Sequence, residues 1–178
     1  MKLRLRRPYG KKSLLLRGKD GLRRLFELSK KDGLNIVDIT GKKASFRRAV
    51  AKGDITLRDE TIKVIKNNDV PKGDVLTVAK TSAIIAVKKT PELIPGCHPI
   101  PLTHIGVDFK IKGNRITAVC EVSSESKTGV EMEALTGATI ALLTIWDMVK
   151  EIEKDDKGQY PYTSIGGIKV VEKVKKEG

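Results

Sequence analysis

The sequence is poor in aromatic residues and in cysteine. Phe, Trp and Tyr together make up 4% of its 178 residues, so the core has to be built from Leu, Ile, Val and Ala. The two cysteines, Cys97 and Cys120, form no C-x-x-C pair. Few and unpaired cysteines are typical of a reducing compartment, and we therefore expect a cytoplasmic protein.

Sequence signatures of several protein classes are also missing. We expect no apolar run long enough for a membrane-spanning helix, and the apolar residues 14–16 are too few for a signal peptide. The chain contains neither the G-x-x-x-x-G-K-[ST] loop nor the G-x-G-x-x-G turn of nucleotide-binding proteins. We therefore expect no membrane association and no nucleotide site of either kind.

Two local matches to catalytic or metal motifs are weak. Residues 124–127 fit S-x-x-K and residues 127–129 fit K-T-G, but one lysine would then fill two distinct roles. Cys97 and His98 could begin a zinc site, with the remaining Cys and His to complete it. Adjacent residues rarely bind one zinc ion, however, and no pair has the usual ligand spacing. We expect no metal and no cofactor.

The net charge of +13 is concentrated at the N-terminus. Residues 1–31 hold twelve Lys or Arg against two acidic residues, a net of +10, which leaves +3 for the rest of the chain. A segment of this kind can bind nucleic acid or acidic partners, but no interleaved aromatics and no nucleic-acid motif support that function. We predict a basic, solvated extension over residues 1–32 and do not expect nucleic acid as a partner.

Apolar and polar residues alternate in three segments, which predicts half-buried strands over residues 48–57, 105–111 and 116–122. Lys112-Gly-Asn between the last two is a tight hairpin connection. A short helix is expected over residues 59–68, and a second begins after Asp74, a suitable N-cap. A proline-rich loop follows over residues 90–101, and a last strand is expected near residues 168–174.

This order predicts an α+β fold of the ferredoxin-like type, a split β-α-β sandwich, with the first short helix as an insertion. An antiparallel sheet of this kind would carry its helices on one face. The alternating strands are expected to place small apolar residues on the other face. We therefore expect that face to meet another subunit.

Residues 127–150 have the most unusual pattern in the chain. From Glu131 onward, apolar residues recur at intervals of three and four, which predicts a helix. No charge occurs between Ala134 and Trp146, so we expect this helix to be buried nearly all round. The charged residues of this segment lie toward its two ends: Lys127, Glu131, Glu133, Asp147 and Lys150. They are either surface residues, where the ends of the helix reach solvent, or residues of a functional site.

His98 is the best candidate for a base outside that helix. It lies in the proline-rich loop, which would fix its imidazole at little further entropic cost. Together with Arg47, Lys72, Lys150 and two glutamates, it would give a site with both bases and cations. Such a mixture suits a phosphorylated substrate that undergoes proton transfers.

Five motifs, in the same order, resemble those of the cyclic pyranopterin monophosphate synthases, the second enzymes of molybdenum cofactor biosynthesis. The motifs are VDIT from Val37, KGDVL from Lys72, LIPGCHPI from Leu93, KTGVEMEALT from Lys127 and IWDMVK from Ile145. The resemblance extends from about Asn35 to about Lys173 and excludes the basic segment. Gly96 and Trp146 differ from the residues common in the family, and these differences concern packing more than chemistry.

The resemblance implies a lyase that acts without a redox cofactor. Its substrate would be (8S)-3',8-cyclo-7,8-dihydroguanosine 5'-triphosphate from an upstream radical enzyme, and its products cyclic pyranopterin monophosphate and pyrophosphate. It further implies one catalytic domain over residues 33–178, in a homohexamer built as a trimer of dimers with sites at the dimer interface. By motif position, the catalytic residues would be Lys72, His98, Asp147 and Lys150. The substrate-binding residues would be Asp38, Arg47, Cys97, His98, Lys127, Glu131, Met132, Glu133 and Lys173.

Two carboxylates of the predicted long helix are too far apart to hold one small ring. Glu133 and Asp147 are fourteen residues apart, which is about 21 Å along a helix with a rise of about 1.5 Å per residue. They could hold opposite ends of an extended substrate, or each could belong to a different site completed by a partner subunit. The assembly that the resemblance implies favours the second arrangement.

Overall fold

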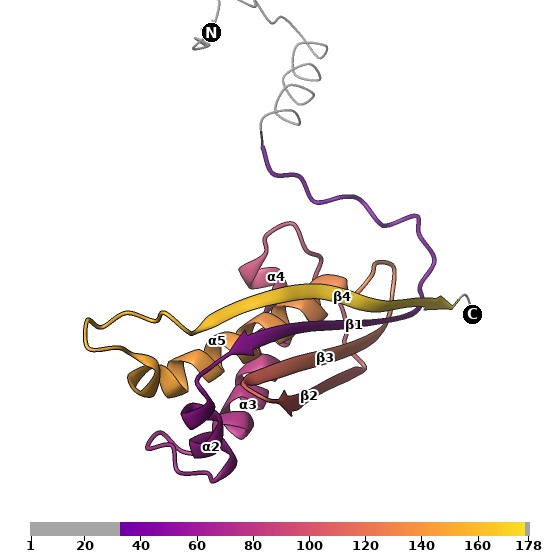
Figure 1. The fold of residues 1–178 in the computed structure, drawn as a ribbon. Helices are drawn as coiled ribbons and strands as arrows, with labels where there is room; N and C mark the ends of the chain where they lie inside the picture. Colours follow the sequence, from indigo (N-terminus) through magenta and orange to yellow (C-terminus); the bar gives the residue numbers. More distant parts are fainter. Residues whose placement is uncertain (1–32, 177–178) are drawn as a thin grey trace, which may run out of the picture. The chain divides into compact units, whose positions relative to one another are not determined.

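The computed structural model describes residues 33–176, so the predicted basic extension lies outside the described residues. From Asp38 onward, these residues form one compact unit. Figure 1 shows its helices and strands. In chain order they are β1 (Ser45–Thr56), α2 (Asp59–Lys66), α3 (Val75–Lys88), α4 (Thr90–Leu93), β2 (His104–Lys112), β3 (Arg115–Ser126), α5 (Glu131–Glu153) and β4 (Ser164–Lys176).

The four strands form one antiparallel sheet in the order β2-β3-β1-β4. β1 lies in the middle, between β3 and β4, and β2 joins β3 through the hairpin predicted at residues 112–114 (Figure 1). Gly113 at the tip of that hairpin has a φ of +57°, a conformation that glycine adopts without strain. The predicted α+β, ferredoxin-like fold is therefore confirmed.

α3 and α5 pack against each other and cover one face of the sheet, where α5 contacts β1, β3 and β4 and α3 contacts β2. The strand residues that face them are small or branched aliphatic residues, as the scarcity of aromatics required. In the two central strands, all are at most 1% exposed: Ala49, Ala51, Ile55, Ile116, Ala118, Cys120 and Val122. Burial of this apolar surface is the main stabilisation of the fold.

Gly137 marks the closest approach of α5 to its neighbours. A Cβ at this position would lie 2.5 Å from Cys120 Sγ on β3 and 2.7 Å from Val87 Cγ2 on α3. Both distances are far below ordinary van der Waals contact, so only glycine fits here without a shift. The alanines around it, Ala134, Ala138 and Ala141, are fully buried. The position of α5 is therefore fixed by close packing along its whole middle.

The other face of the sheet differs from the expectation. Most outward positions of the central strands carry charged or polar side chains, because the main apolar set of each strand faces the helices; Phe46, Val50 and Val119 are the exceptions. Arg48 on β1 forms ion pairs with Glu121 on β3 at 2.7 Å and with Glu172 on β4 at 2.5 Å. The prediction that small apolar residues cover this face is wrong. A subunit contact on this face, which we expected because of those residues, therefore loses its basis.

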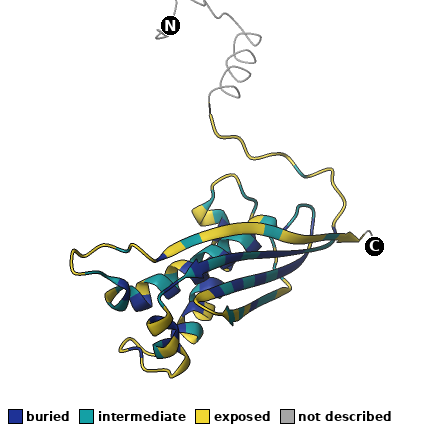
Figure 2. Cartoon of the chain, in the orientation of Figure 1, coloured by how far each residue is buried: buried dark blue, intermediate teal, exposed yellow. Residues whose placement is uncertain are grey.

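Exposed apolar side chains lie on the edge strand β4, at Ile168 and Val171, and on the two long helices. Val78 and Ile85 on α3 are 37% and 51% exposed, and Met132 and Leu143 on α5 are 41% and 50% exposed. The expectation that α5 is buried nearly all round is therefore wrong for one stripe of this helix. Figure 2 shows the contrast with the buried central strands, and also the exposure of much of the edge strand β4.

Two further predictions need correction. The proline-rich segment begins with a short helix, α4, which starts with Pro91 in its first turn, a position that suits proline. By length and composition alone, α5 is apolar enough to cross a membrane, contrary to the expectation that no such segment exists. Half of its apolar stretch is buried inside the protein, as is usual for the core helix of a two-layer fold.

Glu153, the last residue of α5, is fully buried and ties three segments together. Its carboxylate accepts hydrogen bonds from the Arg58 backbone N–H at 3.1 Å, from the Thr61 hydroxyl of α2, and from the Thr163 hydroxyl before β4 at 2.5 Å. Arg58 also lies over the ring of Tyr162, 5.2 Å from its centroid. The end of α5 is thereby fixed relative to both α2 and the start of β4.

We predict that Glu153→Leu lowers the free energy of unfolding by about 2–4 kcal/mol, because it leaves buried donors without an acceptor. Guanidinium chloride unfolding at one fixed protein concentration measures the change. Glu151→Leu is the matched control: Glu151 lies on the same turn, is exposed and pairs with exposed Lys154, so its loss should change stability by less than about 1 kcal/mol. Equal effects of the two substitutions would contradict this role of Glu153.

Candidate functional site

Lys72 lies at the tip of a turn between α2 and α3. The turn is closed by a hydrogen bond from the Gly73 N–H to the Val70 carbonyl at 2.9 Å, and buried Val70 anchors it to the core. Gly73 has a φ of +99°, which suits glycine. The carboxylate of Asp74 accepts hydrogen bonds from the Leu76 and Thr77 N–H groups, both at 3.0 Å, and so confirms the predicted N-cap of α3.

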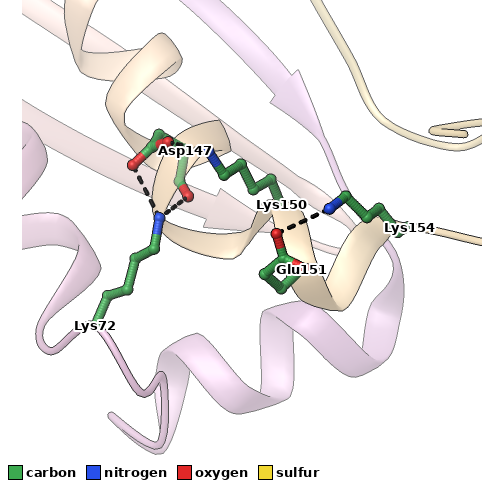
Figure 3. Close-up of polar contacts among 5 residues, drawn as sticks. All are labelled: Lys72, Asp147, Lys150, Glu151 and Lys154. Carbon is green, nitrogen blue, oxygen red and sulfur yellow. Dashed lines mark hydrogen bonds and ion pairs between the residues drawn. The ribbon is translucent and has the colours of Figure 1, made fainter. Parts of the chain in front are cut away.

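This turn brings Lys72 to the C-terminal half of α5, as Figure 3 shows. Lys72 Nζ lies 3.0 Å from Asp147 Oδ2 and donates a hydrogen bond to the Asp147 carbonyl oxygen at 2.7 Å. Lys150 Nζ lies 2.9 Å from Asp147 Oδ1. We call these three residues the α5-end cluster. Each of the three side chains is between 40% and 58% exposed, so the cluster is open to a ligand.

The two lysines hold Asp147 in its ionised form. Hydrogen bonds from Lys150 and Lys72 lower the pKa of the Asp147 carboxyl, and the charges of both lysines act in the same direction. In return, the bond to Asp147 raises the pKa of Lys150. At neutral pH the cluster therefore consists of one carboxylate between two ammonium groups, with an excess of one positive charge.

A second set of predicted residues lies around the start of α5. There, the sheet positions that face the helices change from apolar to polar: Ser45 and Arg47 precede buried Ala49 on β1, and Ser124 and Ser126 follow buried Val122 on β3. These polar residues are buried or half-buried, so the helix-facing side of the sheet holds polar groups inside the fold at this end. We call the residues gathered here the α5-start cluster: Arg47, Cys97, Glu131, Glu133 and Lys173.

Glu131 and Lys173 form an ion pair between α5 and β4. Burial opposes the shift, but a hydrogen bond from Lys173, the backbone N–H of Glu131 itself and the charges of Lys173 and Arg47 together lower the pKa of the Glu131 carboxyl. The Nε of Arg47 is buried and has no hydrogen-bond partner in the described part of the chain. Unpaired buried donors are rare, so this guanidinium has unused capacity for an anionic group.

Glu133, one half-turn further along α5, is in a different state. It is only 3% exposed, and burial raises the pKa of its carboxyl, an effect to which the charge of Glu131 adds. Cys97 lies within electrostatic range of it: burial and the Glu133 charge both raise the pKa of the Cys97 thiol. The loop after α4 therefore places Cys97 near the first turn of α5.

Asp38, His98 and Lys127 form a neighbouring group. The carboxylate of Asp38 accepts a hydrogen bond from the Thr40 N–H at 2.8 Å, and the Lys127 ammonium donates to the Thr40 carbonyl at 2.8 Å. The bonds from Thr40 lower the pKa of the Asp38 carboxyl, and the charges of Lys127 and His98 contribute to the same shift. His98 follows Cys97 directly, so this group adjoins the α5-start cluster.

The structure thus divides the predicted site residues between the two ends of α5. Lys72, Asp147 and Lys150 meet at one end, and the remaining residues lie around the other, with half-exposed Met132 in the first turn. His98, predicted to act with Lys72 and Asp147, lies instead among the residues around the start of α5. Along one helix, Glu133 and Asp147 are about 21 Å apart, from a rise of about 1.5 Å per residue, so no small ring can contact both in one chain.

Two residues that hold the α5-start cluster in place were not predicted. Ser124 donates a hydrogen bond to the Pro101 carbonyl at 2.6 Å and so anchors the loop that carries Cys97 and His98. Gly129 leaves room for the carboxylate of Glu131. The change from apolar to polar residues at the end of β3 could have indicated Ser124. The sequence around Gly129 contains no pattern that would have indicated its role.

An open groove between α3 and β2 does not coincide with either cluster. It has a volume of about 260 Å³ and contains none of the predicted residues, and its lining is half apolar and half polar: Leu76, Thr77, Lys80, Val107, Asp108 and Phe109. Within residues 33–176, no three His, Cys, Asp or Glu side chains are grouped so that they could hold a metal ion.

We predict that Lys72→Met raises the pKa of the Asp147 carboxyl toward its ordinary value, because the carboxylate loses one of its two ammonium partners. Carbon-13 NMR titration of the side-chain carboxyl measures this directly. The matched control is Lys154→Met, which removes a lysine that pairs with Glu151 instead and should leave the Asp147 titration where it was. The same titration midpoint in parent and Lys72→Met protein would show that the contact does not persist in solution.

Comparison with known proteins identifies the family. A model of the MoaC family matches residues 36–176. A probable cyclic pyranopterin monophosphate synthase from Pyrococcus abyssi is 59% identical over 80% of this chain and 90% of its own length. One from Sulfurisphaera tokodaii is 59% identical over 79% and 93%. A relative from Methanothermobacter thermautotrophicus, 52% identical over 82% and 91%, is named a probable accessory protein of the synthase. The chain therefore belongs to the MoaC family.

Proposed function

We propose that this chain is a cyclic pyranopterin monophosphate synthase of molybdenum cofactor biosynthesis. It converts (8S)-3',8-cyclo-7,8-dihydroguanosine 5'-triphosphate to cyclic pyranopterin monophosphate and pyrophosphate, which makes it a lyase. Family membership and the names of the close relatives support this reaction. The observation that carries the proposal is that the charged motif residues, dispersed over more than a hundred positions, gather at the two ends of one helix.

The α5-start cluster suits binding of the guanine-derived ring and of the triphosphate. The carboxylates of Glu131 and Glu133 can accept the paired hydrogens that the amino and ring N–H groups of such a ring present. Arg47 and Lys173 supply charge-assisted hydrogen bonds for phosphate oxygens. Asp38, Cys97, His98, Lys127 and Met132 complete the proposed binding surface.

The buried carboxyl of Glu133 fits this role for an electrostatic reason. Burial raises its pKa, so its charged form is destabilised as long as nothing pairs with it. Two N–H donors from a bound ring would stabilise that charged form and lower the pKa again. Binding of the ring is thereby coupled to ionisation of Glu133.

The α5-end cluster suits proton transfer and departure of pyrophosphate. Asp147, with a lowered pKa, is ionised at rest and is a weak base while both lysines bind it. Phosphate oxygens of the substrate would compete for Lys72 and Lys150 and so raise the basicity of Asp147 when the substrate arrives. The same lysines then neutralise the charge that develops on the leaving pyrophosphate.

A complete site in this proposal needs two chains, with the α5-start cluster of one chain facing the α5-end cluster of another. The separation of the clusters along α5 supports this, and so does the outward stripe of the helix. Met132, Thr139, Leu143 and Lys150 follow one another at intervals of seven, four and seven residues, which places them on one side of the helix. A partner along this stripe would cover its exposed apolar residues. We propose a homohexamer, a trimer of dimers, with sites at the dimer interface.

The proposed substrate also bears on the compartment. It derives from GTP and carries a triphosphate, so we propose that the protein acts in the cytoplasm, where such nucleotides are made. Cys97 and Cys120 are both free thiols, which is compatible with a reducing environment.

The reaction is tested by incubating the purified protein with the product of the upstream radical enzyme and analysing for cyclic pyranopterin monophosphate and pyrophosphate. We predict turnover, and a fall of about 10²–10⁴-fold in kcat for Asp147→Asn, because the amide keeps the shape but not the proton acceptor. Glu151→Gln, one turn further along α5 and outside the cluster, should keep the parent rate. If the folded, assembled parent forms no product, the chain is an accessory protein without this activity.

The two-chain site is tested by mixing inactive Glu133→Gln and Asp147→Asn proteins under conditions that let subunits exchange. A mixed dimer would contain one site with both substitutions and one site with neither, so we predict that activity rises above that of either protein alone. Mixing two preparations of the same variant is the control. If labelled subunits exchange and no activity returns, each site is built by a single chain.

A further inference from the structure

Gly129 lies two residues before α5, directly against the carboxyl group of Glu131. A Cβ at this position would be 1.8 Å from Glu131 Oε2, 2.7 Å from Cδ and 2.8 Å from Oε1, whereas ordinary contact begins at 3.4 Å. The Glu131 side chain is thus folded back over the preceding backbone. It occupies the space that any other residue at position 129 would need for its own side chain.

Backbone geometry gives no separate reason for glycine here. The φ of Gly129 is outside the left-handed region that favours glycine, so alanine could adopt the same backbone. The three nearest atoms in its way belong to the end of one flexible side chain, that of Glu131. Alanine at position 129 would therefore displace the carboxylate of Glu131 without breaking the main chain or the core.

The folded-back position gives the Glu131 carboxylate its partners. It pairs with Lys173 of β4, lies within the electrostatic range of Arg47 and bonds its own backbone N–H at the first residue of α5. The N-cap position, Val130, has no side-chain hydrogen bond to offer the first turn. A displaced carboxylate would lose the geometry of these contacts.

We propose that Gly129 is a positioning residue for substrate binding: the missing side chain lets Glu131 fold back, so that its carboxylate stands beside Lys173 at the start of α5. The effect on substrate rests on the role that the proposed function gives to Glu131. The effect on the carboxylate does not, because the geometry of the chain alone determines it.

The experiment compares Gly129→Ala with Gly166→Ala. Gly166 also has no positive φ, and a Cβ there would meet nothing within 4 Å, so it reports the general effect of exchanging a glycine for alanine. We expect Gly129→Ala to raise KM for the cyclised triphosphate on the order of tenfold, as for a lost charged hydrogen bond, with a smaller change in kcat. Gly166→Ala should leave both unchanged.

A double substitution separates positioning from a general effect on structure. In a Glu131→Gln background the charged partner is already gone, so Gly129→Ala should change KM by less than about twofold further. If Gly129→Ala raises KM by the same factor whether residue 131 is Glu or Gln, its effect does not pass through the carboxylate, and the proposal is wrong. If the single variant fails to fold but Gly129→Ala with Glu131→Ala folds, the clash with Glu131 is confirmed; if neither folds, the proposal is also wrong.

A titration gives a result that does not depend on activity. In the parent, Lys173 and the backbone N–H help to hold the pKa of the Glu131 carboxyl below its ordinary value. Carbon-13 NMR should show that pKa rising in Gly129→Ala and unchanged in Gly166→Ala. An unchanged Glu131 titration in folded Gly129→Ala protein overturns the positioning role. A raised pKa with an unchanged KM would instead remove Glu131 from the proposed substrate-binding residues and, with it, the functional part of this inference.

Discussion

Close packing of α5 on the sheet is the constraint on which the rest of this structure depends. At Gly137 the helix comes so near to Cys120 and Val87 that no side chain fits between them, and buried alanines line the contact on both sides of that point. A shift of the helix along or around its axis would create clashes at one position and cavities at another. Because α5 is a continuous helix of 23 residues, this contact in its middle also fixes the positions of both its ends.

The charged residues of α5 lie near its two ends. On the buried side of its middle, α5 faces aliphatic side chains, and a charged group there would have to give up its hydration without a partner; the outward stripe with half-exposed Leu143 is free of that constraint. At its two ends, loops and strand termini bring partners from elsewhere in the chain: the turn at Lys72 on one side, and β1 and β4 with Arg47 and Lys173 on the other. At the end of α5 near Lys72, Glu153 also fixes α2 and the start of β4 to the helix.

The sequence allowed good prediction where one local pattern determines the outcome. Alternation identified the strands, Asp74 identified the start of α3, and apolar spacing identified α5, which together fix the fold class. The outer face of the sheet was misjudged because each strand has one main apolar set, and the helices bury it. α4 was missed because a helix of four residues has no periodicity, although Pro91 at its start is a favourable residue there.

Which side chains contact each other could not be predicted from sequence patterns alone. Lys72 and Asp147 are 75 positions apart, and their contact depends on the geometry of a turn and on where the close packing places α5. Resemblance to a family indicated which charged residues matter, but not that they divide into two sets. The separation of Glu133 and Asp147 followed from helix geometry, whereas the placement of His98 with the first of them required the path of the loop after α4.

The pKa values of the two carboxyl groups at opposite ends of α5 are shifted in opposite directions. Burial raises the pKa of Glu133, while two lysines lower that of Asp147, although one helix carries both. Pairs of carboxyl groups whose pKa values are moved apart commonly divide binding and proton-transfer roles between them. In the proposed reaction, ring N–H groups would favour ionisation of Glu133, and phosphate groups would release Asp147 from its lysines. Each change requires a different part of the substrate, the ring for Glu133 and the triphosphate for Asp147. Because the two carboxyl groups are about 21 Å apart along one rigid helix, the proposed second chain is the simplest way to bring both clusters to one compact substrate.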